Sequence, residues 1–253
     1  MPDRTEYAPG IPNWVDLQTS DQGAAKRFYT ELFGWSYDDA PMGDDAVYSM
    51  AQLGGKQAAA IAPLPPQQGI PPHWNSYIAT PDVDATTARA TDAGGTVLMP
   101  AMDVMDAGRM SVVADPTGAP IALWQAKNNI GASVVNEPGA FTWNELQTPD
   151  PEAAAAFFAK LVGWKSQYDE GLDYTVFLVG DSPVGGAMKP PMPGIPPNWL
   201  VYFEVADTDA TVAKAKSGGG TVLAEPMDIP PGRFAVLADP QGAVFGVIKS
   251  NPM

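Results

Sequence analysis

The feature that most constrains this chain is an internal repetition, in which an ordered series of motifs occurs twice. The stretch WVDLQTSD at Trp14–Asp21 recurs as WNELQTPD at Trp143–Asp150, 129 positions later. The loop GIPPHW at Gly69–Trp74 recurs as GIPPNW at Gly194–Trp199. Matches in the same order and at similar shifts identify two homologous halves. Further matched pairs are Gly34-Trp35 with Gly163-Trp164, Asp82–Thr86 with Asp207–Thr211, Gly95–Leu98 with Gly220–Leu223, Gly108-Arg109 with Gly232-Arg233, and Asp115–Gly118 with Asp239–Gly242.

The two halves predict two domains, residues 1–127 and 138–253, joined by the polar segment 126–140, which contains Gly and Pro. Each half divides again, because a strand, a capped helix and several strands run from Trp14 to about Pro66 and the same order restarts near Trp74. We therefore predict an α+β fold made of four tandem βαβββ modules. Paired modules are expected to curl mixed β-sheets around a cleft, so that each half forms one cup.

Local signals place the helices and strands of these modules. Asp21 and Asp150 are candidate N-caps, and Pro151 suits the first position of a helix. The second helix of each half is expected to begin at Asp84 or Asp209 and to end at a pair of glycines. Runs rich in β-branched and apolar residues predict strands at Val47–Leu53, Met110–Ala114, Ile121–Trp124, Tyr174–Val179, Phe234–Ala238 and Val244–Ile248.

Charge and composition restrict the partners. The formal net charge is −15 and the pI is about 4.2, so nucleic acid and anionic membranes are unfavourable partners and a cationic ligand is attracted. The chain has no Cys, which excludes disulfides and thiolate chemistry. No apolar run approaches the ~18 residues that span a bilayer, and the N-terminal stretch lacks a signal-peptide core. We expect a cytoplasmic protein, with export by a route without a cleavable signal left open.

Two motifs carry a resemblance to a known family. FYTELFGW follows the first predicted strand, and ADPTG precedes the last strand of the first half. With this order of elements, the whole chain resembles the vicinal oxygen chelate superfamily, which includes glyoxalase I, extradiol dioxygenases, fosfomycin-resistance enzymes and bleomycin-binding proteins. Longer stretches, such as WNELQT and the GIPP-W loop, are similar to actinobacterial glyoxalase-like members.

The resemblance implies a divalent metal, held by a His or Gln on the first strand of a module and a Glu on the last. In this chain those positions are occupied by other residue types. They are Trp14, Asn75, Trp143 and Leu200 on first strands, and Ala122 and Gly246 on last strands. These side chains do not form a nitrogen and oxygen ligand set for a catalytic divalent metal. We therefore expect no metal ligands and no cofactor.

Strand alternation places Trp14, Asp16 and Gln18 on one face of the first strand. The family pattern turns this face into the cup, and the second half offers the equivalent set Trp143, Glu145 and Gln147. An indole beside a carboxylate and an amide suits a flat aromatic or cationic organic molecule. Desolvation is expected to raise the pKa of Asp16 and Glu145, so that either could act as a general base. The alternative is that both carboxylates pair with an Arg or with backbone amides and that the tryptophans belong to the core.

Several further residues complete the predicted site. Arg109 and Arg233 are expected to pair with the carboxylates or to hold developing negative charge. Tyr77 and Tyr202 are expected to point inward as hydrogen-bond donors. His73 is the only histidine, and Asn198 is its counterpart, so a histidine-based triad is excluded. The remaining predicted ligand-binding residues are Asn75 and Trp124.

The sequence leaves three functions open. The first is a metal-independent lyase, isomerase or hydrolase that detoxifies or tailors a small carbonyl or polyketide-like compound. The second is a non-catalytic protein that sequesters an aromatic or cationic metabolite, as bleomycin-binding relatives do. The third is an exported antigen. Because four modules are present in one chain, either a monomer or a homodimer would suffice.

Overall fold

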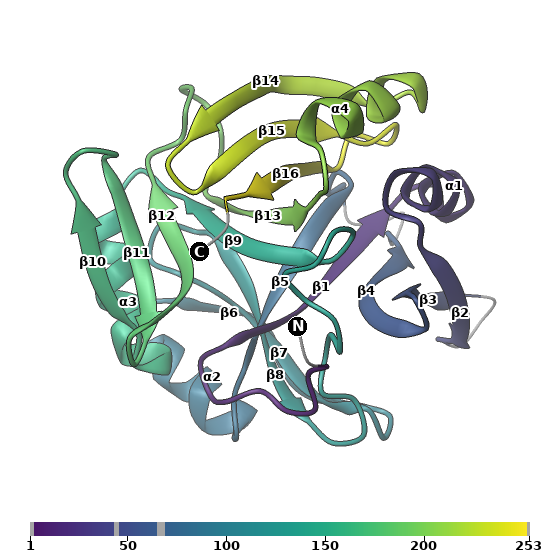
Figure 1. The fold of residues 1–253 in the computed structure, drawn as a ribbon. Coiled ribbons are helices and arrows are strands. Elements are labelled where there is room, and N and C mark those ends of the chain that lie inside the picture. Colours follow the sequence, from purple (N-terminus) through teal and green to yellow (C-terminus); the bar gives the residue numbers. More distant parts are fainter. Residues whose placement is uncertain (1–2, 43–45, 65–68, 252–253) are drawn as a thin grey trace.

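A computed structural model describes residues 3–42, 46–64 and 69–251 and confirms the predicted α+β fold of four βαβββ modules (Figure 1). Modules 1 and 2 consist of β1 (Pro12–Thr19), α1 (Gln22–Phe33), β2 (Ser36–Pro41), β3 (Val47–Leu53) and β4 (Lys56–Pro63), followed by β5 (His73–Ala79), α2 (Val83–Asp92), β6 (Thr96–Val104), β7 (Gly108–Ala114) and β8 (Pro120–Ala126). Modules 3 and 4 consist of β9 (Phe141–Gln147), α3 (Pro151–Val162), β10 (Lys165–Asp169), β11 (Tyr174–Val179) and β12 (Ser182–Met188), followed by β13 (Asn198–Glu204), α4 (Thr208–Ser217), β14 (Thr221–Ile229), β15 (Gly232–Ala238) and β16 (Val244–Ser250).

Each half forms one eight-stranded mixed sheet. The strand order is β2-β3-β4-β1-β5-β8-β7-β6 in the first half and β10-β11-β12-β9-β13-β16-β15-β14 in the second. Within a module the first strand runs parallel to the last, as β1 does to β4, and the two modules meet through an antiparallel pair such as β1 and β5. Both sheets are therefore open, with the first strands of the modules at the centre.

Two of the four predicted helix starts are correct. The carboxylates of Asp21 and Asp150 each accept a hydrogen bond of 2.9 Å, from the amides of Ala24 and Ala153. In contrast, the expected starts at Asp84 and Asp209 are wrong. The N-caps of α2 and α4 are Asp82 and Asp207. Asp84 and Asp209 lie inside the first turn of their helices, where their carboxylates are free to pair with other side chains.

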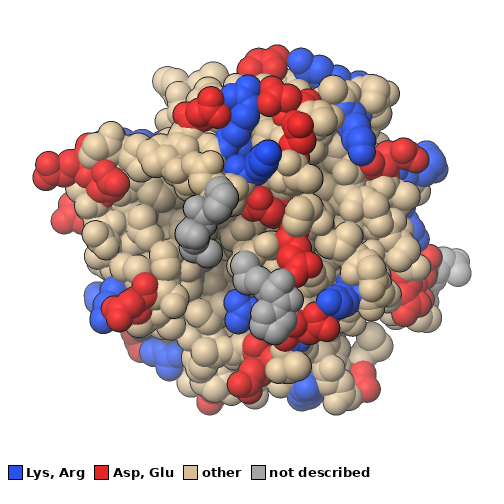
Figure 2. Space-filling model, in the orientation of Figure 1, with Lys and Arg blue, Asp and Glu red and all other residues tan. Residues whose placement is uncertain are grey.

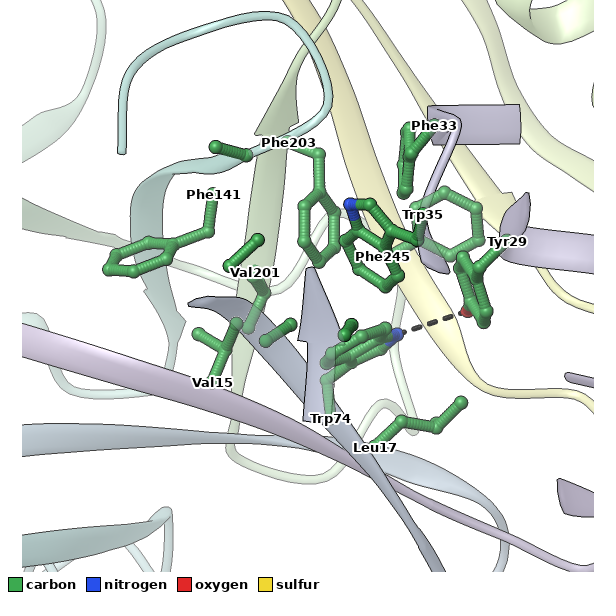
Figure 3. Packing of buried hydrophobic residues seen from close by; sticks show 14 of the residues in the cluster. Val15, Leu17, Tyr29, Phe33, Trp35, Trp74, Phe141, Val201, Phe203 and Phe245 are labelled. Atoms are coloured by element: carbon green, nitrogen blue, oxygen red, sulfur yellow. Dashed lines mark hydrogen bonds between the residues drawn. The ribbon is translucent and has the colours of Figure 1, made fainter. Parts of the chain in front are cut away.

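The two halves pack together through their helix-bearing faces. In the first core the ring of Phe33, on α1, lies 4.9 Å from that of Phe203, on β13, and Tyr29 lies 5.5 Å from Phe245, on β16 (Figure 3). The second core combines Phe157 and Phe158, on α3, with apolar side chains of module 2. The first helix of each half is thus covered by the second module of the other half.

The tryptophan of the repeated Gly-Trp motif forms a hydrogen bond between the two halves in each copy. The indole nitrogen of Trp35, after α1, donates to the carbonyl of Gly139 at 2.7 Å, near the start of the second half. Its counterpart Trp164 donates to the carbonyl of Gly10 at 2.7 Å, in the first half. Both indoles are buried, so each makes a hydrogen bond that crosses between the halves. No helix in the described part of the chain is long and apolar enough to cross a membrane.

Candidate functional site

The first candidate site lies on the face of the first sheet opposite its helices. Register pairs Trp14 with Tyr77, Asp16 with Asn75, and Gln18 with His73 across β1 and β5. Paired residues share a face. Leu17 lies on the other face and belongs to the core, whereas the carboxylate of Asp16 lies among polar side chains. This is the face that strand alternation predicts for Trp14, Asp16 and Gln18.

Asp16 is the centre of a buried polar cluster. Its residue surface is only 4% exposed. Tyr48 and Tyr77 donate their hydroxyls to Oδ2 at 2.9 and 2.8 Å, and the amide of Asn75 donates to Oδ1 at 2.9 Å. The indole nitrogen of Trp14 in turn donates to the Tyr48 hydroxyl at 2.9 Å. An indole, a phenol and a carboxylate are therefore linked in a chain.

The second half repeats this arrangement around Glu145. Register pairs Trp143 with Tyr202 and Glu145 with Leu200 across β9 and β13. The hydroxyl of Tyr202 donates to Oε1 of Glu145 at 3.3 Å, and the amide of Gln147 donates to the same atom at 3.4 Å. Trp143 donates to the hydroxyl of Tyr174 at 2.9 Å. The two clusters thus share an indole, two phenols and a single carboxylate.

Sequence reasoning missed Tyr48 and Tyr174. Both lie at the start of strands that were predicted correctly, β3 and β11. They reach the carboxylates because β4 or β12 connects these strands to the first strand of the module. The sequence of a single strand does not show which strand pairs with it. The occurrence of a tyrosine at the same position in both halves could nevertheless have indicated a shared role.

Burial dominates the electrostatics of both carboxyl groups. Desolvation raises the pKa of Asp16, and hydrogen bonds from Asn75, Tyr77 and Tyr48 oppose the shift. Desolvation also raises the pKa of Glu145, opposed by hydrogen bonds from Gln147, Tyr202 and Tyr174. Of the ion pairs among the described residues, none includes either carboxylate. A carboxylate with a raised pKa is a stronger proton acceptor than an ordinary one.

The expected pairing of Arg109 and Arg233 with these carboxylates is wrong. Arg109 donates to both oxygens of Asp84 at 2.7 and 2.9 Å, and Arg233 binds Asp209 with the same two distances. On β7, Ser111 follows Arg109 by two positions and contacts Thr87 of α2 at 2.7 Å. Arg109 therefore lies on the helix-bearing face, because side chains alternate along a strand. Arg233, on β15, binds Asp209 of α4 and therefore also lies on the helix-bearing face of its sheet. Neither guanidinium is part of the cups.

The remaining predicted residues have distinct positions. The ring of Trp124 lies 6.4 Å from that of Tyr77, edge to face, and its indole nitrogen donates to the carbonyl of Asn129 at 2.8 Å. Gln18 lies at the end of the same row, opposite His73. The His73 ring contacts the carbonyl of Pro71 at 2.8 Å, which is a loop interaction.

The donor set of the cups does not fit the metal that the fold family implies. The described residues contain no group of three or more His, Cys, Asp or Glu side chains that could hold a metal ion. Each cup has one carboxylate at its centre, and Tyr, Asn or Gln groups donate hydrogen bonds to its oxygens. These N–H and O–H groups stabilise an anion at the carboxylate position.

A family model defines the class of this protein. The family model of the Glyoxalase/Bleomycin resistance protein/Dioxygenase superfamily matches residues 11–123 and again residues 135–247. The chain belongs to this superfamily, which confirms the resemblance seen in its motifs.

Several relatives are similar to this chain over nearly its whole length. The chain is 58% identical over 259 residues to "Putative glyoxylase CFP32" of Mycobacterium bovis and of Mycobacterium tuberculosis, covering 100% of this chain and 99% of the relative. It is 41% identical over 262 residues to "Anthracycline biosynthesis protein DnrV" of Streptomyces peucetius, covering 97% of this chain and 95% of that protein.

Solved structures agree on the fold. The Mn(II)-bound glyoxalase from Novosphingobium aromaticivorans superimposes with a TM-score of 0.67 at 16% identity, over 95% of this chain and 82% of that one. The 2,3-dioxygenase LapB from Pseudomonas sp. KL28 gives a TM-score of 0.66 at 14% identity, over 97% of this chain and 94% of that one.

Proposed function

We propose that this protein binds a flat, polycyclic aromatic carbonyl compound in its cups and catalyses proton transfer on that compound without a metal. The observation that carries the proposal is the repeated cluster in which an indole, two phenols and one buried carboxylate meet. A lyase, isomerase or hydrolase reaction of the detoxifying or natural-product tailoring kind would begin with such a transfer.

Three features support this ligand class. Trp143, which is partly exposed, provides aromatic surface next to Glu145, whereas Trp14 is buried in the core. The net charge of −15 attracts a ligand that also carries a cationic group. One relative is named as an anthracycline biosynthesis protein, and anthracyclines combine a fused aromatic ring system with carbonyl groups.

The proposed step uses only residues of this chain. The carboxylate removes a proton from the carbon next to a carbonyl group, and the C–H electron pair moves into an enolate. The newly protonated carboxyl is a weaker hydrogen-bond acceptor than the carboxylate. The tyrosine hydroxyls are then available to the enolate oxygen, which bears the negative charge. Return of the proton to the same or a neighbouring carbon completes an exchange or an isomerisation.

Daunorubicin, a cationic tetracyclic quinone with a methyl ketone, is a suitable probe. Protein and probe are incubated in D2O with a chelator present, and NMR follows loss of the methyl proton signal. We expect exchange above the buffer rate with the wild-type protein, and a loss of at least tenfold in the Asp16→Asn/Glu145→Gln double variant. The Arg109→Gln/Arg233→Gln variant is the matched control, because both guanidiniums lie outside the cups. Binding without exchange would contradict the catalytic proposal.

A second function, sequestration without chemistry, is favoured by one observation. Asp16 accepts three hydrogen bonds of 2.8 to 2.9 Å, so its oxygens are already well satisfied. A cup of this kind can hold an aromatic ring without accepting a proton. If calorimetry shows that daunorubicin binds and NMR shows no proton exchange above the buffer rate, the protein sequesters the compound and does not catalyse proton transfer.

A further inference from the structure

We infer that the two cups have different roles: the cup around Glu145 is the reactive one, and Gly186 and Gly246 position its two phenols. The carboxylate of Asp16 is the weaker base of the two. This inference rests on the proposed function and assigns it to one half of the molecule.

The first argument is the difference in hydrogen bonding between the carboxylates. Asp16 accepts three short hydrogen bonds, which occupy both oxygens. The hydrogen bonds that Tyr202 and Gln147 donate to Oε1 of Glu145 measure 3.3 and 3.4 Å, and Tyr174 donates to the same carboxylate. Long hydrogen bonds are weak, so they stabilise the carboxylate less than short ones do. Glu145 therefore keeps more of the proton affinity that burial gives it.

The second argument is a pair of glycines found only in the second cup. Gly186 is paired with Glu145, and Gly246 is paired with Tyr202. A Cβ at Gly186 would lie 2.3 Å from the Tyr174 ring and hydroxyl, and a Cβ at Gly246 would lie 2.2 Å from the Tyr202 ring. Each phenol therefore lies directly on the backbone of a neighbouring strand. A methyl group at either position would displace the phenol.

The first cup has side chains at the corresponding positions. Ala60 is paired with Asp16 as Gly186 is with Glu145, and Ala122 is paired with Tyr77 as Gly246 is with Tyr202. Two more differences make the second cup less polar and less filled by aromatic rings. Leu200 replaces Asn75 opposite the carboxylate, and Ile248 replaces Trp124 on the last strand. An apolar ring system is thus better accommodated next to Glu145.

The third argument is a cavity on the same face of the second sheet as Glu145. A cavity of about 650 Å³ is lined by residues of β10, β11 and β12, including Gln167 and Val176. Register places Gln167, Val176, Gly186 and Glu145 in one row across four strands, on one face of the sheet. Neighbouring strands are about 4.8 Å apart, so Val176 at the cavity wall is about 10 Å from the Glu145 position. The Tyr174 ring lies against Gly186 between them.

The rim of this cavity is acidic. Asp169, Glu170 and Asp181 line it, and Asp and Glu side chains gather where β10 and β11 form the edge of the molecule (Figure 2). Acidic side chains at the entrance suit a ligand with an apolar ring system and a cationic substituent. The ring system would pass over Val176 toward Tyr174 and Glu145, with the cation held at the rim.

Calorimetry with daunorubicin and the exchange measurement in D2O together test this assignment. We expect Glu145→Gln alone to lower the exchange rate at least tenfold, and by a larger factor than Asp16→Asn lowers it. Gly186→Ala and Gly246→Ala should each lower the exchange rate at least tenfold. They should also shift its pH profile, because displaced phenols no longer donate to Glu145. Ala60→Gly and Ala122→Gly are the matched controls and should change the rate less than twofold.

The outcomes separate this inference from the proposed function. If the wild-type protein exchanges the probe and Asp16→Asn abolishes exchange while Glu145→Gln does not, the assignment to the second cup is wrong and the function stands. Equal losses in both variants likewise overturn the assignment. If the wild-type protein shows no exchange, the function itself fails. The melting temperature of Glu145→Gln is compared with that of the wild-type protein. If the two are equal, a lower exchange rate in the variant is not caused by unfolding.

Discussion

The interfaces around α1 and α3 differ in several side chains, and the difference with the clearest consequence is one buried hydroxyl group. In the interface around α1, the Tyr29 hydroxyl accepts a hydrogen bond of 3.2 Å from the indole of Trp74 (Figure 3). The same hydroxyl donates to Oδ2 of Asp239 at 3.2 Å. In the interface around α3, Phe158 occupies the position of Tyr29. The counterparts of the two bonded groups, the Trp199 indole nitrogen and Oδ2 of Asp115, are buried there without a hydrogen-bond partner.

This comparison shows how a duplicated structure keeps its shape while its interactions diverge. The rings of Phe158 and Trp199 lie 5.4 Å apart at 83°, almost as Tyr29 and Trp74 do, at 5.5 Å and 85°. Apolar packing therefore fixes the geometry of both interfaces, and the hydroxyl is an addition to it. The same principle applies to the cups, where a common scaffold holds an aspartate with short hydrogen bonds in one half and a glutamate with long ones in the other.

The largest effect is expected for Tyr29→Phe, which removes this hydroxyl from the first interface, as in the second. It leaves the Trp74 indole and Asp239 Oδ2 without the hydroxyl, and each buried unpaired group costs about 1 to 3 kcal/mol. We expect the free energy of unfolding to fall by about 2 to 4 kcal/mol, measured by urea denaturation. Tyr37→Phe, which removes a longer hydrogen bond of 3.3 Å from a partly exposed residue, is the control. A loss below about 0.5 kcal/mol in Tyr29→Phe would mean that the hydroxyl is not an effective partner.

A smaller effect, of opposite sign, is expected for Phe158→Tyr. The new hydroxyl would supply a partner for the Trp199 indole and for Asp115, so the free energy of unfolding should rise by about 1 kcal/mol. The same urea denaturation measures it. A decrease would show that the space around the Phe158 ring does not admit an oxygen. The double variant Tyr29→Phe/Phe158→Tyr would then separate lost packing from lost hydrogen bonding.

The smallest effect is a pH dependence around Asp239. Desolvation raises the pKa of this carboxyl, opposed by hydrogen bonds from backbone amides and from Tyr29. The folded protein therefore keeps a proton on Asp239 at pH values where the unfolded chain, with a pKa of about 3.9, has released it. The stabilisation of the folded state is complete below about pH 4 and is lost as the pH rises through the folded pKa. As the pH rises through the folded pKa of Asp239, the free energy of unfolding of the wild-type protein should fall relative to that of Asp239→Asn. A difference between the two proteins that stays constant from pH 3 to 7 would contradict the raised pKa of Asp239.

Much of the fold could be predicted from the sequence because its signals are local. Asp21 and Asp150 predicted helix starts through their own capping hydrogen bonds, and Val47–Leu53 and Tyr174–Val179 match strands β3 and β11. Alternation along a single strand placed Trp14 and Asp16 correctly on one face.

The site was predicted less completely because it depends on pairing between strands. Tyr48 and Tyr174 reach the carboxylates from strands two places away, and no local pattern shows which strands are neighbours. The error over Arg109 and the error over Asp84 have one cause. When Asp82 is recognised as the cap, Asp84 is left free on the helix, and it becomes the partner of the arginine.

The crystal structure of the daunorubicin complex tests the central claim most directly. We predict that the ring system lies against Trp143 in the second cup. Its ketone oxygen should be within hydrogen-bond distance of the Tyr174 or Tyr202 hydroxyl, and the methyl carbon next to the Glu145 carboxylate. A ligand bound outside the second cup, or one whose carbonyl contacts neither Tyr174 nor Tyr202, would contradict the account.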